Sequence, residues 1–204
     1  SRVAALPLLV ASGLVHELGH AAALLRAGYP PGRIGVGMLA VLPVLWCDVS
    51  AVGMLAKRER VRVDLAGPIL QLAVAGLCSA VGRLMSGPAA AVCATVAAWA
   101  FLATGWSLTP FFRADGFWVL TDLVGLDDLD RPPRRGDPRR TLLLLAAYRL
   151  AHAIFFGALA AAALRRADPQ TGAGGLALGV GLALAGMVVL RVTRFVRPLV
   201  RQFP

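Results

Sequence analysis

Five apolar stretches dominate this sequence, and each is long enough to cross a lipid bilayer. A helix needs about 20 mostly apolar residues to span the hydrocarbon core, and the segments 3–27, 61–84, 88–108, 141–164 and 174–192 reach that length. Of the 204 residues, 58% are hydrophobic and only 16% are charged, whereas soluble domains carry about 25% charged residues. The sequence therefore predicts an all-α polytopic membrane protein with about five transmembrane helices, and excludes a soluble or disordered chain.

Basic residues flank these stretches unevenly. Sixteen of the 21 lysines and arginines lie in 26–62, 113–140 and 191–201. Because positively charged loops remain in the cytoplasm, these segments are expected there, with the first helix running from outside to inside. The net charge is +10, but the arginines are interspersed between apolar runs. This placement indicates contact with the bilayer surface and no nucleic-acid partner.

The polar, proline-rich segment 127–140 divides the chain. We expect a core over 1–125 with three membrane helices, a solvated cytoplasmic linker over 126–140, and a helix pair with a basic tail over 141–204. The start at Ser1 leaves open a helix before it. The three cysteines show no CxxC spacing, which indicates packing residues and not a thiol metal site.

His16, Glu17 and His20 form an HExxH motif within the first apolar stretch. Residues four apart share one face of a helix, so both imidazoles can reach one metal ion while Glu17 acts as a base beside it. Ionisable groups at this depth destabilise the inserted helix. The alternative, a polar cluster that only links helices, would place three such residues there without a function.

A catalytic zinc usually has three protein ligands, and the third must come from elsewhere in the chain. Asp115 is the better candidate and His152 the other. Pro110 is expected to end the third helix, and Gly116 to let the backbone turn. That helix ends on the same side as the HExxH residues, so the Asp115 carboxylate could reach them. The alternative role for Asp115 is a helix cap near the membrane boundary.

Together these motifs resemble the site-2 protease family of intramembrane zinc metalloproteases over roughly the first 125 residues. The resemblance implies one Zn²⁺ per chain, held by His16, His20 and Asp115, with Glu17 as the catalytic base. Pro110 and Gly116 match the family's spaced Asp-Gly segment, but Ser107 stands where the family has an Asn that helps to hold the substrate backbone.

Two further matches concern the second apolar stretch and the residues after Asp115. An Ala-Gly-Pro turn characteristic of the family appears at 66–68, and Gln71 stands where an Asn is common. The Asp-Gly-Phe-Trp run at 115–118 is similar to the branch of peptide zinc metalloproteases. Ser107, Pro110, Gly116 and Gln71 are therefore candidate substrate-positioning residues.

The function implied is an intramembrane endopeptidase of a bacterial cytoplasmic membrane, with its active site open to the cytoplasm. Its substrate would be a transmembrane segment or, alternatively, a ribosomally made peptide precursor. A second possibility is a zinc-binding membrane protein without peptidase activity. The oligomeric state is left open.

Three other segments carry narrower predictions. The stretch 34–50 is β-prone or re-entrant, where the family has a hairpin that pairs with substrate; a linker at the membrane interface is the alternative. Arg149 is expected to pair with Asp122 or Asp64. His152 is expected to form a hydrogen bond between helices, or alternatively to contact substrate. The basic cluster at 57–62 is expected to be solvated and to face lipid.

Overall fold

The structure, a computed structural model, describes residues 2–39, 42–168 and 170–202. Its described part consists of helices and one small sheet. The elements in chain order are η1 (Arg2–Ala5), α1 (Leu6–Arg26), β1 (Ile34–Leu39), β2 (Leu42–Cys47), η2 (Ser50–Met54), α2 (Lys57–Leu84), α3 (Gly87–Ser107), α4 (Asp115–Val124), α5 (Arg139–Leu164) and α6 (Gly172–Gln202).

Five of these helices, α1, α2, α3, α5 and α6, are long and apolar enough to cross a membrane. The predicted all-α polytopic membrane protein is thus confirmed as a fold class. Helix α2 begins at Lys57 and α6 continues to Gln202, beyond the apolar stretches that mark them in the sequence. The added turns carry several arginines, whose long stems can lie along apolar surface while their charged groups reach water.

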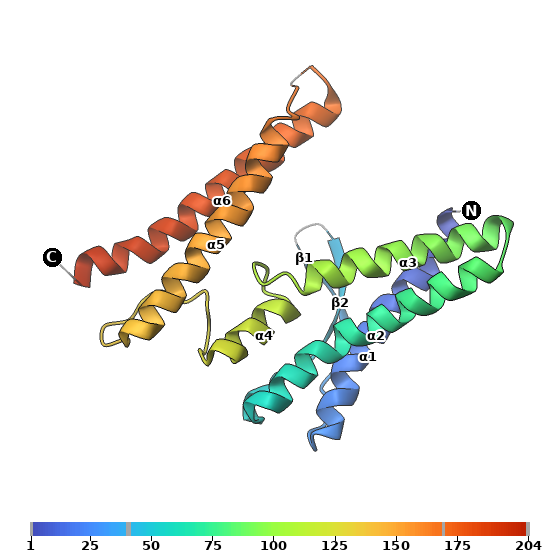
Figure 1. Cartoon of the computed structure of the whole chain (residues 1–204), viewed down its shortest axis with the longest axis horizontal. Helices are drawn as coiled ribbons and strands as arrows, with labels where there is room; N and C mark the ends of the chain where they lie inside the picture. Colours follow the sequence, from blue (N-terminus) through green and yellow to red (C-terminus); the bar gives the residue numbers. More distant parts are fainter. Residues whose placement is uncertain (1, 40–41, 169, 203–204) are drawn as a thin grey trace. The chain divides into compact units, whose positions relative to one another are not determined.

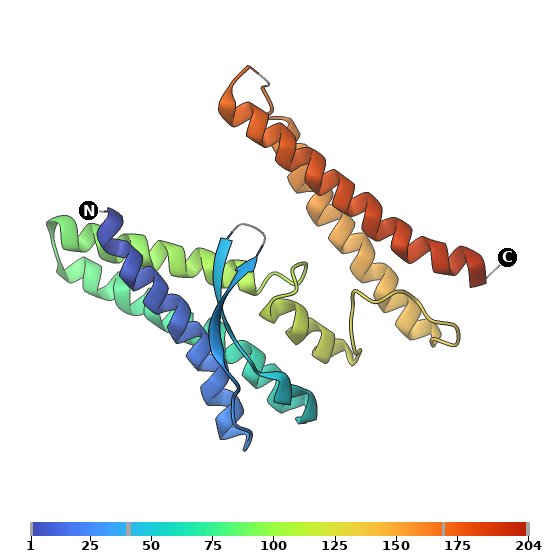
Figure 2. The same ribbon diagram turned by 180° about the vertical axis from the view of Figure 1, so that it is seen from behind.

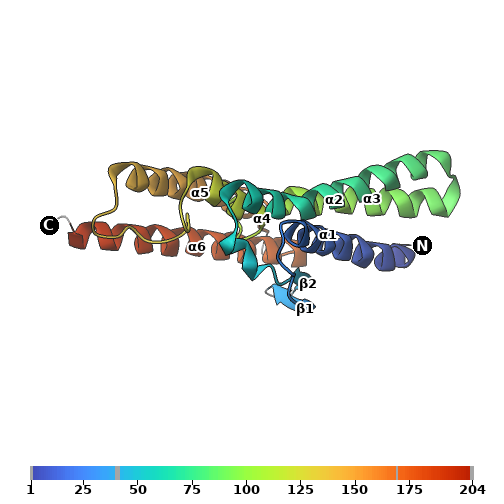
Figure 3. The same ribbon diagram turned by 90° about the horizontal axis from the view of Figure 1, so that it is seen from below.

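The chain divides into two compact units, Ser1–Gly125 and Leu126–Pro204. In the first unit, α2 and α3 run antiparallel side by side (Figure 1), and α1 packs against α2. Figures 2 and 3 show α1 and the β-hairpin on the same side of the α2–α3 pair. Helix α2 is therefore the central element of the unit, with contacts to α1, α3 and α4.

The segment 34–50 contains an antiparallel hairpin of β1 and β2, in which Ile34 pairs with Cys47 and Leu39 pairs with Leu42. The β conformation, which the sequence predicts as one possibility for this segment, is therefore present. Strand β2 contacts α1. Val36 and Met38 of β1 are largely exposed, as apolar side chains are where a protein faces lipid or another apolar partner.

Helix α3 ends at Ser107 and α4 begins at Asp115, so the chain breaks where Pro110 predicts it. Two sequence-based details are wrong. Gly116 does not turn the backbone by its own conformation, because it lies in the first turn of α4 and is not among the described glycines with a positive φ. The Ala-Gly-Pro segment at 66–68 is also not a turn, because α2 continues through it with Pro68 inside the helix.

In the second unit, α5 and α6 pack together as an antiparallel pair (Figure 1). Arg149 donates hydrogen bonds to the carboxylate and the backbone carbonyl of Asp130, and Arg191 donates to the same carboxylate at 3.1 Å. The predicted pairing of Arg149 with Asp122 or Asp64 is therefore wrong. Asp130, from the segment before α5, is closer along the chain than either, and it links α5 to α6.

The segment before α5 is more ordered than a solvated linker. Arg131 forms ion pairs with Asp127 at 3.0 Å and with Asp137 at 2.8 Å, and Leu129 is buried. Hydrogen bonding to Arg131 is the main cause that lowers the pKa of Asp137 to about 2. The prolines and charges that indicate a linker in the sequence therefore form a compact ion-pair network.

Candidate metal centre

The side chains of His16, His20 and Asp115 converge within the first unit. The two Nε2 atoms are 3.1 Å apart, and they lie 3.2 and 3.3 Å from the two carboxylate oxygens of Asp115. The side chains are 12%, 8% and 19% exposed, respectively. The structure thus brings together two residues of one helix and a third nearly a hundred residues further along the chain.

These spacings fit a tetrahedral metal ion. With ligand atoms about 2.0–2.1 Å from a zinc ion, neighbouring ligand atoms in a tetrahedron lie about 3.3–3.4 Å apart. The distance between the two Nε2 atoms, and the distance from each of them to one Asp115 oxygen, are 3.1–3.3 Å and close to that value. One ligand atom from each of the three residues lies within 4.8 Å of the others. In the described part of the chain, these three residues form the group whose ligand atoms could hold a metal, and His152 is not in it.

Both histidines are oriented by acceptors on α2. His16 Nδ1 donates to Gln71 Oε1 at 3.1 Å, and His20 Nδ1 donates to the backbone oxygen of Val63 at 2.7 Å. With the proton on Nδ1, each neutral ring presents the Nε2 lone pair to the centre. Hydrogen bonds of this kind fix the tautomer and orientation of metal-binding histidines. Gln71 therefore orients a candidate ligand, and the substrate-positioning role predicted for it stays a prediction.

Gly67 provides the space for His20. A Cβ atom at position 67 would lie 2.3 Å from His20 Nε2, far inside van der Waals contact. Only glycine lets the imidazole lie against the α2 backbone at this point. The small residues of the Ala-Gly-Pro segment thus serve close helix packing at the centre and not a turn.

Asp115 is the first residue of α4, where a carboxylate is stabilised by the helix dipole. Burial raises the pKa of Asp115, but the two imidazole rings beside its carboxylate outweigh burial and lower the pKa to about 2. The next residue needs to be glycine because a Cβ at Gly116 would lie 2.0 Å from the Leu108 carbonyl oxygen. This close approach lets the 108–114 connection fold back on the start of α4.

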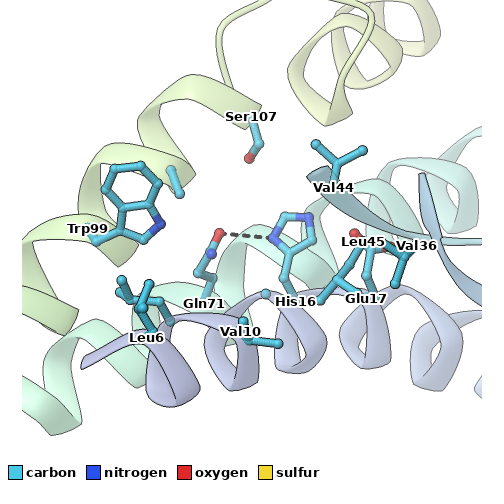
Figure 4. A pocket seen from close by; sticks show the side chains of 13 residues that line it. Leu6, Val10, His16, Glu17, Val36, Val44, Leu45, Gln71, Trp99 and Ser107 are labelled. Atoms are coloured by element: carbon cyan, nitrogen blue, oxygen red, sulfur yellow. Dashed lines mark hydrogen bonds between the residues drawn. The ribbon is translucent and has the colours of Figure 1, made fainter. Parts of the chain in front are cut away.

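Glu17 lies beside the three convergent residues and lines a cavity of about 540 Å³ (Figure 4). Its carboxylate is within electrostatic range of His16, His20 and Asp115, and within hydrogen-bonding reach of the Cys47 backbone in β2. The cavity walls come from α1, α2, α3 and the hairpin. The residues lining it are Leu6, Leu9, Val10, Gly13, His16, Glu17, Val36, Val44, Leu45, Gln71, Trp99, Ala103 and Ser107.

The remaining candidate residues differ in their relation to this cavity. Ser107 lines it at the end of α3 and donates its hydroxyl proton to the Thr104 carbonyl at 3.2 Å. Pro110 lies in the 108–114 connection and is not among the lining residues. Gly116 acts through the close approach already described. Of these residues, Ser107 and Gln71 could contact a molecule in the cavity directly.

The sequence does not predict the contacts that the basic cluster at 57–62 makes with α4. The basic cluster at 57–62 is not simply solvated, because Arg60 pairs with Asp122 of α4 at 2.6 Å and Lys57 donates to the Leu123 carbonyl at 2.7 Å. Its other members fit the prediction better: Arg62 forms an exposed pair with Glu59 on the same helix. No sequence pattern links Arg60 to a carboxylate 62 residues away.

Comparison of the chain with models of known protein families, with curated proteins and with solved structures gives no match. The residues of the site and their geometry are therefore the basis for its proposed function.

Proposed function

We propose that this protein is an intramembrane zinc endopeptidase of the site-2 protease type. The observation that carries the proposal is the convergence of His16, His20 and Asp115, whose ligand atoms lie within 4.8 Å of one another, with Glu17 beside them. A base is not needed to hold a metal ion, so Glu17 favours hydrolysis over metal binding alone. Its position at the wall of a cavity adjoining the centre is where a substrate peptide would need it.

Each residue has one role in this proposal. Zinc, when bound by His16, His20 and Asp115, would polarise the scissile carbonyl and make a water molecule more acidic. Glu17 accepts the proton of that water and later delivers it to the leaving amine. Gln71 and the Val63 carbonyl hold the two imidazoles in the tautomer that leaves Nε2 available.

The cavity supports an apolar substrate segment. Its polar members, His16, Glu17, Gln71 and Ser107, are accompanied by mostly aliphatic and aromatic side chains from α1, α3 and the hairpin. A volume of about 540 Å³ is within the usual range for ligand pockets. These properties suit a hydrophobic stretch, either a transmembrane segment or the apolar part of a peptide precursor.

The proposed location is a bacterial cytoplasmic membrane, with the centre open to the cytoplasm. The support for this orientation is the charge distribution, because the lysines and arginines gather at the α1 C-terminus, the α2 N-terminus and the segment after α3. The turn between α2 and α3 has only Arg83 near it. The metal ligands lie toward the arginine-rich ends of their helices.

The test compares wild-type protein with Glu17→Gln in the same membranes. The variant should retain zinc in a stoichiometric metal assay but lose cleavage, because glutamine has nearly the same shape and cannot accept the proton. New protein termini should appear by mass spectrometry with wild type only. The uncleaved substrate should be recovered with the Glu17→Gln protein after crosslinking.

Leu18→Ala is the matched control, because Leu18 is the next residue of α1 and is largely exposed. This variant should cleave like wild type. Equal cleavage by Glu17→Gln and wild type would refute Glu17 as the base. Stoichiometric zinc with identical termini in all three membranes would favour the zinc-binding protein without peptidase activity.

A further inference from the structure

Helix α4 carries a metal ligand at its first residue, yet it is only 10 residues long. An isolated helix shorter than about 12–15 residues is marginal in water. Tertiary contacts must therefore hold α4 and fix the position of Asp115. In the first unit the packing partner of α4 is α2, the helix that also orients His16 and His20.

Helix α4 has two buried side chains and a charged contact with α2. Phe117 and Thr121 are almost fully buried. At the far end of α4, Arg60 donates from Nε and from a terminal nitrogen to Asp122 Oδ1, at 2.7 and 2.6 Å. Lys57 donates to the carbonyl of Leu123, in the last turn of the helix, where a cation also interacts favourably with the helix dipole.

We propose that Arg60 and Lys57 are positioning residues for the metal ligand Asp115. The inference rests on the proposed metal centre. Asp115 and Asp122 are seven residues apart, so they share one face of α4 and lie about 10.5 Å apart along its axis. Fixing Asp122 against α2 therefore sets the rotation of α4, and with it the direction of the Asp115 carboxylate.

A second carboxyl group near Arg60 makes this arginine more important for the position of α4 than its partner Asp122. Asp64 lies one turn further along α2, is buried, and is within electrostatic range of Arg60, Asp122 and Asp115. Its Oδ2 atom has no hydrogen-bond partner among the described residues. Removal of Arg60 leaves the carboxyl groups of Asp64 and Asp122 within electrostatic range of each other without this cation. Arg60→Gln should therefore disturb α4 more than Asp122→Asn does.

The experiment measures metal binding in purified full-length protein with Zn²⁺ and Co²⁺ as probes. Competition with a chromophoric chelator gives the affinity, and the visible absorption of Co²⁺ reports its coordination. Loss of an orienting contact around a metal site typically weakens binding 10–100-fold. Arg60→Gln and Asp122→Asn should fall in that range, and Arg60→Gln should shift the Co²⁺ spectrum toward that of Asp115→Ala.

Arg58→Gln is the matched control, because Arg58 is on the same helix, carries the same charge and is exposed. It should keep wild-type affinity and spectrum. Arg60→Lys, which keeps the charge, should recover part of the affinity. Lys57→Gln should weaken binding less than Arg60→Gln, because Lys57 contacts a backbone carbonyl and not a second side chain.

The outcomes separate this inference from the proposed function. Wild-type affinity and an unchanged Co²⁺ spectrum in both Arg60→Gln and Asp122→Asn would overturn the positioning role while leaving the metal centre intact. Weakening by Arg58→Gln as large as that by Arg60→Gln would also overturn it, because the effect would then be one of general charge. A wild-type protein that binds neither ion would overturn the metal centre itself.

Discussion

Gln71 of α2 accepts a hydrogen bond from Nδ1 of His16 in α1 at 3.1 Å, across 55 residues of sequence. The Thr104 hydroxyl of α3, which donates its proton to the Ala100 carbonyl at 2.8 Å, lies 3.4 Å from the same Gln71 oxygen. One buried amide therefore connects the three helices that surround the candidate centre. The hydrogen bond to Gln71 orients the His16 ring so that its Nε2 atom lies toward Asp115.

Gln71→Ala should weaken zinc binding about 10–100-fold, because His16 then loses the acceptor that holds its ring and tautomer. Chelator competition measures the affinity. Gln71→Glu keeps an acceptor and should bind zinc more tightly than the alanine variant. Leu72→Ala, at an exposed neighbouring position, should have no effect. Equal affinities for Gln71→Ala and wild type would show that other contacts orient His16.

Gly67→Ala should abolish or strongly weaken metal binding, because the new methyl group would lie 2.3 Å from His20 Nε2. Since the α2 backbone cannot move away easily in a packed helix, the imidazole must rotate out of the centre. The matched control is Gly76→Ala, on the same helix with open space around its Cβ position. Metal content of the purified variants distinguishes the two, and full zinc occupancy in Gly67→Ala would contradict the geometry.

Protonation of Asp137 should destabilise the folded segment before α5 at low pH. Its pKa is lowered from 3.8 to about 2 by its hydrogen bonds with Arg131 and the Arg134 amide. A lowered pKa means that the ionised carboxylate stabilises the folded segment above pH 4, and that this contribution is lost as the pH falls toward 2. Hydrogen exchange of the Arg134 amide, corrected for its intrinsic rate, should lose protection over that interval.

In Asp137→Asn the Arg134 amide should already be less protected at neutral pH and should show no further loss of protection in this interval. An unchanged pH profile in the variant would show that another group controls the segment.

Asp130→Asn should destabilise the helix pair α5–α6. Arg149 is buried and its guanidinium contacts both the carboxylate and the carbonyl of Asp130. Removing one partner of a buried ion pair costs about 3–5 kcal/mol because the other charge remains buried. A thermal unfolding series in detergent would show a lower midpoint. Asp127→Asn, which removes a largely exposed carboxylate, should change stability by less than about 1 kcal/mol.

The sequence alone predicts the membrane class and much of the candidate centre. Five apolar stretches are sufficient to predict five spanning helices, because the bilayer thickness requires a minimum helix length. His16 and His20 can be paired from their spacing, since a helix places residues four apart on one face. These predictions depend on local geometry, which the chain determines without reference to the rest of the fold.

Other features depended on how the helices pack. Nothing in the sequence indicates that Arg149 contacts Asp130, that Arg60 contacts Asp122, or that Gly116 lies against the Leu108 carbonyl. Arginines beside apolar stretches usually face water or headgroups, and the cluster at 57–62 has that pattern. Its role at α4 follows only from the packing of α4 on α2.

The sequence by itself therefore determined which segments form helices and which side chains share a helix face. The tertiary structure decided which faces meet: α2 provides the acceptors for both imidazoles, and α4 carries the carboxylate of Asp115 to them. The physical reason is that periodicity along one helix follows from its backbone hydrogen bonds. The contacts between helices follow from close packing of side chains that lie far apart in the chain.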